Sequence, residues 1–217
     1  MADYAERRTT MVDTQVRPSD VTKFPIIDAM LSVPRELFVP ADKREAAYVG
    51  ENIDLGGGRV VLEPRTMAKM LEAADIQPGE LVLDIGCGYG YSSALAARMA
   101  DAVIALEDNE ALVAEAEKAL GEAGADNAAA VLGTLEEGAA KHGPYDVMLI
   151  QGAVEHFPDA LMGQLKDGGR VVAIFAEGSL GTARVGYHID GGINWRFAFN
   201  AGAPVLPGFE ARRAFVL

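Results

Sequence analysis

The sequence has little cysteine, few aromatic residues and no clustered positive charge. Its single cysteine, Cys87, excludes an intrachain disulfide and any metal site built from several cysteines. Lysine and arginine number 19 against 32 acidic residues, which gives a formal net charge of −13. Duplex nucleic acid is bound through a basic surface that displaces counterions. We therefore expect no nucleic-acid partner and no metal.

Long apolar runs are also missing. No stretch approaches the roughly 20 apolar residues of a membrane-spanning helix. The opening residues MADYAERR have no apolar segment behind their charges, unlike a secretory signal peptide. We expect a cytoplasmic protein with no membrane partner. Of the 217 residues 50% are nonetheless hydrophobic, which is enough to build a large core.

Two regimes divide the chain, and we expect both to belong to a single domain, 1–217. Residues 1–78 are mixed and punctuated by prolines, so we expect an N-terminal extension of helices and loops. Residues 79–217 begin as near-continuous apolar runs that alternate with amphipathic segments. This alternation is typical of buried parallel strands joined by right-handed helical crossovers.

The apolar runs predict a sheet. The five parallel strands are expected at 81–85, 102–106, 129–132, 146–150 and 170–175. Residues 182–189 and 195–201 flank a glycine-containing turn and indicate an antiparallel hairpin, and 213–217 indicate one more strand. We therefore predict an α/β fold with a doubly wound, mostly parallel seven-stranded sheet and a C-terminal antiparallel hairpin, which is a Rossmann-like arrangement.

Local patterns organise residues 1–78. Ser19 or Asp20 can cap a helix that stops near Pro34. The stretch 54–58 contains three consecutive glycines and is expected to be a loop, because glycine loses too much conformational freedom in a regular element. Pro64 suits the first turn of a helix, and apolar residues follow it at helical spacing.

The most informative segment follows the first predicted strand. Asp84-Ile85-Gly86-Cys87-Gly88-Tyr89-Gly90 places three alternating glycines between a buried strand and a helix. Glycine lets the backbone turn sharply and come close to a ligand. The spacing G-x-G-x-G differs from the G-x-G-x-x-G of dinucleotide sites, which argues against an oxidoreductase. The acid before the glycines suits the ammonium group of S-adenosylmethionine, a cofactor without a pyrophosphate.

Further cofactor contacts are expected at the ends of the neighbouring strands. Glu107 lies 17 positions after the last glycine and is followed by Asp108; a carboxylate there can accept both ribose hydroxyls. Thr134 and Leu135 follow the third strand and should flank the adenine, and Gln151 ends the fourth strand near the expected methyl position. The predicted cofactor-binding residues are Asp84, Ile85, Gly86, Cys87, Gly88, Tyr89, Gly90, Glu107, Asp108, Thr134, Leu135 and Gln151.

Three other residues near these positions have different expected roles. Asp146 lies at the opposite end of its strand from the site and is expected to be structural. Cys87, within the glycine segment, is expected to fill space and not to act as a nucleophile. His156 follows the fourth strand, where it could reach a substrate at the pocket mouth.

Several segments resemble the protein-L-isoaspartate O-methyltransferase family of class I S-adenosylmethionine-dependent methyltransferases. They are 33–40 (VPRELFVP), 47–48, the glycines at 56–58 with Pro64, 82–91, 144–146, 164–170 and 215–217. The resemblance covers nearly the whole chain and implies the methyltransferase version of the Rossmann-like fold. It also implies S-adenosyl-L-methionine as cofactor and S-adenosyl-L-homocysteine as product. The implied partner is a protein or peptide that carries an isoaspartyl residue, whose carboxylate receives the methyl group.

The implied repair chemistry asks little of the enzyme. The methyl ester closes to a succinimide, which reopens partly to normal aspartate. A carboxylate is already ionised at neutral pH, so no general base is required. Catalysis would then consist mainly of aligning the reacting groups in a dry pocket.

The substrate half of the site departs from the family. Where the family carries a pattern close to Thr-Ile-Ser-Gln-Pro, residues 60–64 read Val-Val-Leu-Glu-Pro. The resemblance places Leu62 and Glu63 in the catalytic substrate loop, with Leu62 in place of the serine. Leucine cannot donate a hydrogen bond, and an ionised Glu63 would repel a carboxylate. Thr134 also stands where the family usually has an acidic residue.

Three functions remain open from the sequence. The first is isoaspartyl methylation, with Thr66 or a backbone N–H in place of the missing hydroxyl. The second is methylation of a different, unidentified small molecule, in which Glu63 attracts a cationic group or acts as a base. The third is a non-catalytic relative that binds the cofactor or its product as a sensor or scaffold.

Overall fold

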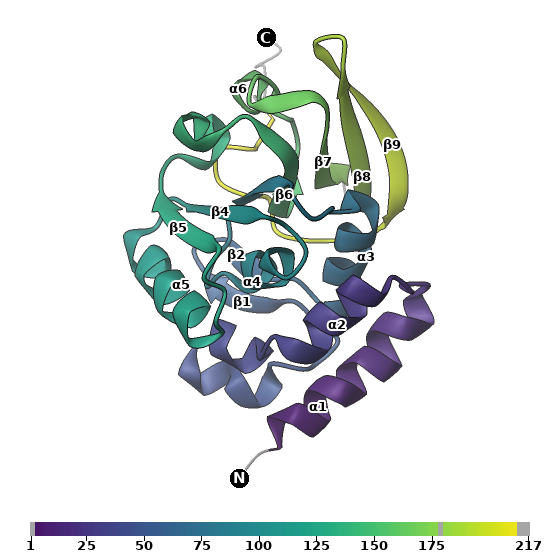
Figure 1. The fold of residues 1–217 in the computed structure, drawn as a ribbon, viewed down its shortest axis with the longest axis vertical. Helices are drawn as coiled ribbons and strands as arrows, with labels where there is room; N and C mark the ends of the chain where they lie inside the picture. The colour runs from purple at the N-terminus through teal and green to yellow at the C-terminus, as the bar shows by residue number, and fades with distance from the viewer. Residues whose placement is uncertain (1–2, 178–179, 212–217) are drawn as a thin grey trace, which may run out of the picture.

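The computed structural model describes residues 3–177 and 180–211, and its centre is a seven-stranded sheet flanked by helices (Figure 1). The strands lie in the order β5-β4-β3-β6-β7-β8-β9. They are β3 (Leu81–Ile85), β4 (Ala102–Glu107), β5 (Ala128–Leu132), β6 (Tyr145–Val154), β7 (Leu165–Glu177), β8 (Leu180–Ile189) and β9 (Gly192–Asn200). Strands β3 to β7 pair in parallel, whereas β8 and β9 are antiparallel. The predicted doubly wound sheet with a C-terminal hairpin is confirmed.

Helices precede the sheet and connect its strands. The α-helices are α1 (Tyr4–Met11), α2 (Phe24–Ser32), α3 (Pro64–Ala74), α4 (Tyr91–Ala97), α5 (Glu110–Glu122) and α6 (Asp159–Met162). Short 3₁₀ or π segments are η1 (Val12–Val16), η2 (Arg17–Ser19), η3 (Arg35–Phe38), η4 (Ala41–Ala46), η5 (Leu135–Glu137) and η6 (Ala140–His142). Helix α3 begins at Pro64 as predicted, because a missing N–H costs nothing in the first turn.

The predicted cap of α2 is wrong. The helix begins at Phe24 with Lys23 as its N-cap, whereas Ser19 belongs to η2. Asp20 adopts a left-handed φ of 63°, which ends η2 instead of starting α2. Pro25 lies in the first turn of α2 and fixes the start of the helix there.

Residues 54–58 are also more regular than predicted. Strands β1 (Ile53–Gly56) and β2 (Arg59–Val61) pair in an antiparallel hairpin, so 54–56 belong to a strand. The glycines at 56, 57 and 58 have φ values of +84°, +59° and +78°, which residues with a Cβ rarely adopt. The three glycines therefore form the tight end of a hairpin and not an open loop.

Alternate residues of the central strands point into two cores on opposite faces of the sheet. Val82 and Val147 join a core with residues of α1 to α5, so the N-terminal helices share one apolar interior with the sheet. Leu83 and Met148 join the other core, together with residues of η5, α6 and the segment after β9. The second face of the sheet is therefore covered partly by the irregular segment that follows β9 and not by helices alone.

Strands β6 and β7 are longer than predicted. The last residue of β3 paired with β6 is Ile85, opposite Ile150, but β6 continues to Val154. Four residues of β6 therefore extend beyond the end of its neighbour. The strand predicted at 213–217 lies outside the described residues.

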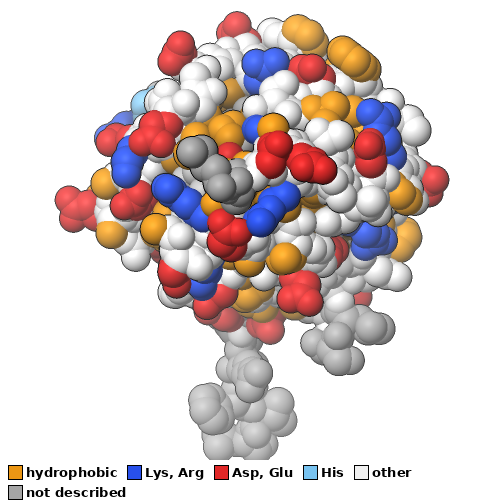
Figure 2. Space-filling view, turned by 90° about the horizontal axis from the view of Figure 1, so that it is seen from below, with side chains coloured by type: hydrophobic (Ala, Val, Ile, Leu, Met, Phe, Trp, Pro, Cys, Tyr) orange, Lys and Arg blue, Asp and Glu red, His pale blue; other side chains and the backbone are white. Residues whose placement is uncertain are grey.

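Two further observations concern the chain as a whole. Figure 2 shows the face at the bottom of Figure 1, where acidic and basic side chains are interspersed and form no continuous basic patch. Among the described residues, no helix combines the length and apolar character needed to cross a membrane.

Candidate functional site

A crevice is expected between β3 and β6. The chain proceeds outward from β3 to β4 and β5 on one side, and from β6 to β7 on the other. Ligands of doubly wound proteins bind at such a switch point, outside the carboxyl ends of the strands. Here β3 ends at Ile85, and the glycines at 86, 88 and 90 have φ values of +73°, +56° and +88° before α4 begins. The sharp turn predicted from the glycine spacing is confirmed.

Asp84 forms the floor of this crevice and is completely buried. One carboxylate oxygen accepts hydrogen bonds from the hydroxyls of Ser92, at 2.6 Å, and Ser93. The other accepts one from Gln151 Nε2 at 2.7 Å. Burial raises the pKa of Asp84, and the three hydrogen bonds oppose that rise. Asp84 and Gln151, both predicted to contact the cofactor, are thus hydrogen-bonded to one another in this structure.

Glu107, at the end of β4, is also completely buried and is paired with Arg59 of β2. Arg59 Nε lies 3.1 and 3.2 Å from the two Glu107 oxygens, and its Nη2 lies 2.5 Å from Asp108 Oδ1. Glu107 also accepts hydrogen bonds from the backbone N–H groups of Gly88, Asp108 and Asn109. Burial raises the pKa of Glu107, whereas Arg59 and the Gly88 N–H lower it. Both oxygens expected to receive ribose hydroxyls are therefore engaged by the chain itself.

The space of the crevice is taken by residues 203–209, which we call the strap. It runs beside the extension of β6: Ala153 N–H donates to Pro204 O at 2.8 Å, and Leu206 N–H donates to Ala153 O at 2.9 Å. The Leu206 side chain is fully buried. A Cβ placed on Gly86 would lie 3.2 Å from Leu206 Cδ1, and one on Gly152 would lie 2.5 Å from Leu206 Cγ.

The crevice in this conformation does not fit S-adenosylmethionine. Pockets for ligands of that size hold about 300–1,000 Å³. The cavity nearest the predicted methyl position, lined by Leu62, Cys87, Ser92 and Gln151 among others, holds about 10 Å³. That is roughly the space of one water molecule. The acidic residues and the glycine turn suit the cofactor. The space of the crevice, however, is filled by the strap, and the carboxylates of Asp84 and Glu107 are already hydrogen-bonded to the chain.

The remaining members of the glycine segment are placed as its spacing suggests. Ile85 is buried in the core, and Tyr89 is partly exposed at the edge of the turn. Cys87 is buried, and burial raises the pKa of its thiol well above the ordinary value. A buried neutral thiol is unreactive, which agrees with its predicted space-filling role.

The predicted substrate loop, 60–64, is held by burial and hydrogen bonds. The Leu62 side chain is 2% exposed, and its carbonyl oxygen accepts a hydrogen bond from Arg35 Nη2 at 2.8 Å. Glu63 is half-buried at the start of α3 and accepts a hydrogen bond from Thr66 Oγ1 at 2.7 Å. Thr66 itself is 1% exposed. The hydroxyl suggested as a replacement for the serine is thus already bonded to the neighbouring acid.

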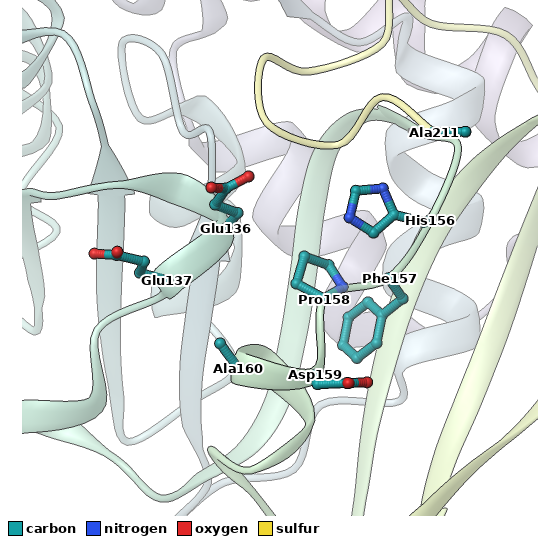
Figure 3. Close-up of a pocket in the computed structure, with 8 residues that line it drawn as sticks. All are labelled: Glu136, Glu137, His156, Phe157, Pro158, Asp159, Ala160 and Ala211. Carbon is teal, nitrogen blue, oxygen red and sulfur yellow. The ribbon is translucent and has the colours of Figure 1, made fainter. Parts of the chain in front are cut away.

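A larger groove of about 540 Å³ lies between η5 and the segment after β6 (Figure 3). Figure 3 shows two glutamates on one side and His156, Phe157 and Pro158 on the other. Its lining residues are Glu136, Glu137, His156, Phe157, Pro158, Asp159, Ala160 and Ala211. His156 Nδ1 is 3.2 Å from the Phe209 carbonyl oxygen, so this histidine contacts the strap. Thr134 is exposed just before η5, and Leu135 is buried beside Gly86.

Comparison with known proteins decides the family. The model of the family described as protein-L-isoaspartate(D-aspartate) O-methyltransferase matches residues 6–182. The chain belongs to this family. A protein-L-isoaspartate O-methyltransferase of Koribacter versatilis is 37% identical over 172 residues, which cover 79% of this chain and 78% of the relative. A second, from Shewanella sediminis, is 37% identical over 169 residues, or 78% of this chain and 69% of the relative.

Solved structures of the protein-L-isoaspartate O-methyltransferase family share the fold. One aligns with a TM-score of 0.80 at 24% identity over 93% of this chain and 66% of its own. Another, a Plasmodium falciparum protein described as a protein-L-isoaspartate O-methyltransferase, is in complex with S-adenosyl-L-homocysteine. It aligns with a TM-score of 0.78 at 17% identity over 95% of this chain and 99% of its own.

Three residues that matter most in the site were missed by the sequence reasoning. Arg59 is buried beside the valines of a short strand. A single cation next to apolar residues was the sequence signal that could have indicated a buried ion pair. Arg35 is fully buried without a carboxylate partner among the described residues. Leu206 lies in a proline-containing apolar segment with neither helical nor strand periodicity, so nothing in the sequence indicated its position.

Proposed function

We propose that the protein is an S-adenosylmethionine-dependent methyltransferase that acts in the cytoplasm on isoaspartyl carboxylates of damaged proteins. The observation that carries this proposal is the family match over 6–182, together with relatives of 37% identity that bear that name. The β3–turn–α4 unit and the acids Asp84 and Glu107 support it, because they stand where the cofactor of such enzymes is expected.

We assign these residues binding and positioning roles and no proton transfer. The isoaspartyl carboxylate is ionised at neutral pH and attacks without a base. Main-chain N–H groups are the donors that could take the place of the missing serine at Leu62, because the Thr66 hydroxyl is bonded to Glu63. The protein then contributes orientation and exclusion of water.

A second candidate function is a non-catalytic relative of these enzymes. It is favoured by the Arg59–Glu107 pair and by Leu206, which use the hydrogen bonds and the volume that a cofactor needs. Leu62 in the substrate loop points the same way, because it offers no hydroxyl.

One labelling experiment separates the two candidates. The purified protein is incubated with methyl-labelled S-adenosylmethionine and an isoaspartyl peptide, and the matching aspartyl peptide is the control. We expect label on the isoaspartyl peptide alone. Absence of label, in a sample shown by circular dichroism to be folded, would favour the non-catalytic relative.

A further inference from the structure

The crevice at the switch point is closed by two separate parts of the chain. The first is Arg59, at the start of β2, which neutralises Glu107 and Asp108 from within. The second is the strap, whose Leu206 covers Gly86 and Gly152. Arg59 blocks the expected ribose position by charge and hydrogen bonding, whereas Leu206 blocks the space above the glycine turn.

The hairpin that carries Arg59 lies close to the strap. A Cβ on Gly58, next to Arg59 in the chain, would lie 3.7 Å from Pro207 Cδ of the strap. A Cβ on Gly88 would lie 2.6 Å from Leu55 Cδ1, so β1 covers the glycine turn as well. The β1–β2 hairpin and the strap therefore lie next to one another, and together we call them the cover.

The hairpin, the strap and the substrate loop meet at Asn52. Its Nδ2 donates a hydrogen bond to Gly202 O at 3.0 Å, next to the strap. Its Oδ1 accepts a hydrogen bond from the Glu63 N–H at 2.8 Å. Asn52 therefore joins the residue that precedes the strap to the predicted substrate loop.

The cover contains a buried donor that has no partner among the described residues. Arg59 is 2% exposed, yet its Nη1 has no hydrogen-bond partner among the described residues. A buried donor without a partner costs free energy in the closed state. The strap lacks helical structure, and Pro204 and Pro207 remove two of its backbone donors. Its backbone is joined to Ala153, Glu155 and His156 by four hydrogen bonds, and these have to break for the strap to leave.

We propose that Arg59 and Leu206 form an internal latch that occupies the cofactor crevice, and that S-adenosylmethionine binds only after both have moved aside. This inference rests on the proposed function, because it assumes that the crevice belongs to that cofactor. A ligand that binds one conformation has its apparent affinity reduced by the fraction of molecules in that conformation. Weakening the latch therefore raises cofactor affinity without any new contact to the cofactor.

The test is calorimetric titration of S-adenosyl-L-homocysteine into the full chain and its variants. Arg59→Gln removes the cation, and Leu206→Ala removes the apolar cover. Arg98→Gln is the control for the first, because Arg98 pairs with Asp28 on the surface at the far end of α4. Leu165→Ala is the control for the second, because Leu165 belongs to the same core but lies at the start of β7. Circular dichroism confirms that each variant is folded.

We expect each latch variant to bind at least about tenfold more tightly than the wild type, and each control to stay within about twofold. Equal affinity in all five proteins would overturn the latch. Binding in none of them would overturn it too, because the obstacle would then lie elsewhere. If Arg59→Gln does not fold, Leu206→Ala alone decides.

The labelling experiment on the isoaspartyl peptide keeps the two proposals apart. Tighter binding without labelling in any protein would support the latch and refute the proposed function. Labelling by the wild type, with no gain of affinity in the variants, would support the function and refute the latch.

Discussion

Replacement of Arg59 by methionine is expected to destabilise the protein strongly. Methionine keeps much of the buried volume but leaves the Glu107 carboxylate without its cation. Removing one partner of a buried ion pair typically costs about 3–5 kcal/mol. Glu107 would keep three backbone N–H donors, so we place the loss near the lower end, at about 3 kcal/mol. For a chain of this size that corresponds to a fall of about 6–12 °C in Tm.

The loss should depend on pH in a definite direction. Burial raises the pKa of Glu107 in the wild type, and removal of Arg59 takes away a group that lowers it. A raised folded-state pKa means that the folded protein takes up a proton more readily than the unfolded chain. The free-energy cost of burying the Glu107 carboxylate is therefore small at pH values below the unfolded-state pKa. It grows as the pH rises through the folded-state pKa, because the carboxylate is then ionised in the folded protein. Arg59→Met should cost less at pH 5 than at pH 8.

Urea unfolding at these two pH values measures the effect. Arg98→Met is the matched control and should cost less than about 1 kcal/mol, because the Arg98–Asp28 pair is exposed. The double variant Arg59→Met/Glu107→Gln should recover part of the loss, since no buried charge remains. A loss below about 1 kcal/mol for Arg59→Met at pH 8 would refute a buried ionised pair at this position.

Three further outcomes are expected. Asp146→Asn should cost about 1–2 kcal/mol at pH 7 and less near pH 3 in urea unfolding. Burial acts to raise the pKa of Asp146, but the Leu81 N–H and Lys166 outweigh it and hold that pKa below its ordinary value. The stabilisation is therefore lost as the pH falls through the folded-state pKa. An equal cost at both pH values would contradict this. Leu62→Ser should raise isoaspartyl turnover while the affinity for S-adenosyl-L-homocysteine stays the same; unchanged turnover would remove this loop from the substrate site. Cys87 should react with iodoacetamide at pH 8 far more slowly in the folded protein than in urea, because its thiol is buried with a raised pKa, and equal rates would refute that burial.

Much of the fold could be predicted because parallel strands buried on both faces leave a strong pattern. Near-continuous apolar runs such as 81–85 and 102–106, set between amphipathic segments, indicate buried parallel strands. The ends of helices and strands were predicted less well. Some of them are decided by hydrogen bonds to distant parts of the chain, which the local sequence pattern does not show. β6 continues to Val154 because β7 and the strap pair with it there. The start of α2 depends on the backbone angles of Asp20 and Pro25, which propensity alone does not fix.

The residues of the candidate site could be predicted from the sequence, but their hydrogen-bond partners could not. Glycine spacing and strand ends placed Asp84, Gln151 and Glu107 around one crevice, and the structure brings Asp84 and Gln151 within 2.7 Å. What the spacing could not reveal is that these polar groups are satisfied by other parts of the chain. Arg59 is separated from Glu107 by 48 residues, and no local rule connects a hairpin cation with a strand-end acid.

Leu206 shows why sequence patterns cannot predict what fills the crevice. Its neighbours in space, Gly86 and Gly152, are glycines whose missing side chains leave room that either a ligand or the chain itself can fill. From the sequence both outcomes look the same, because the glycines are required in each. The deciding quantity is the free-energy difference between a strap packed on β6 and a strap in solvent. Under the proposed latch the cofactor competes with the strap for the same space, so the change in affinity on Leu206→Ala reports the contribution of this side chain to that difference.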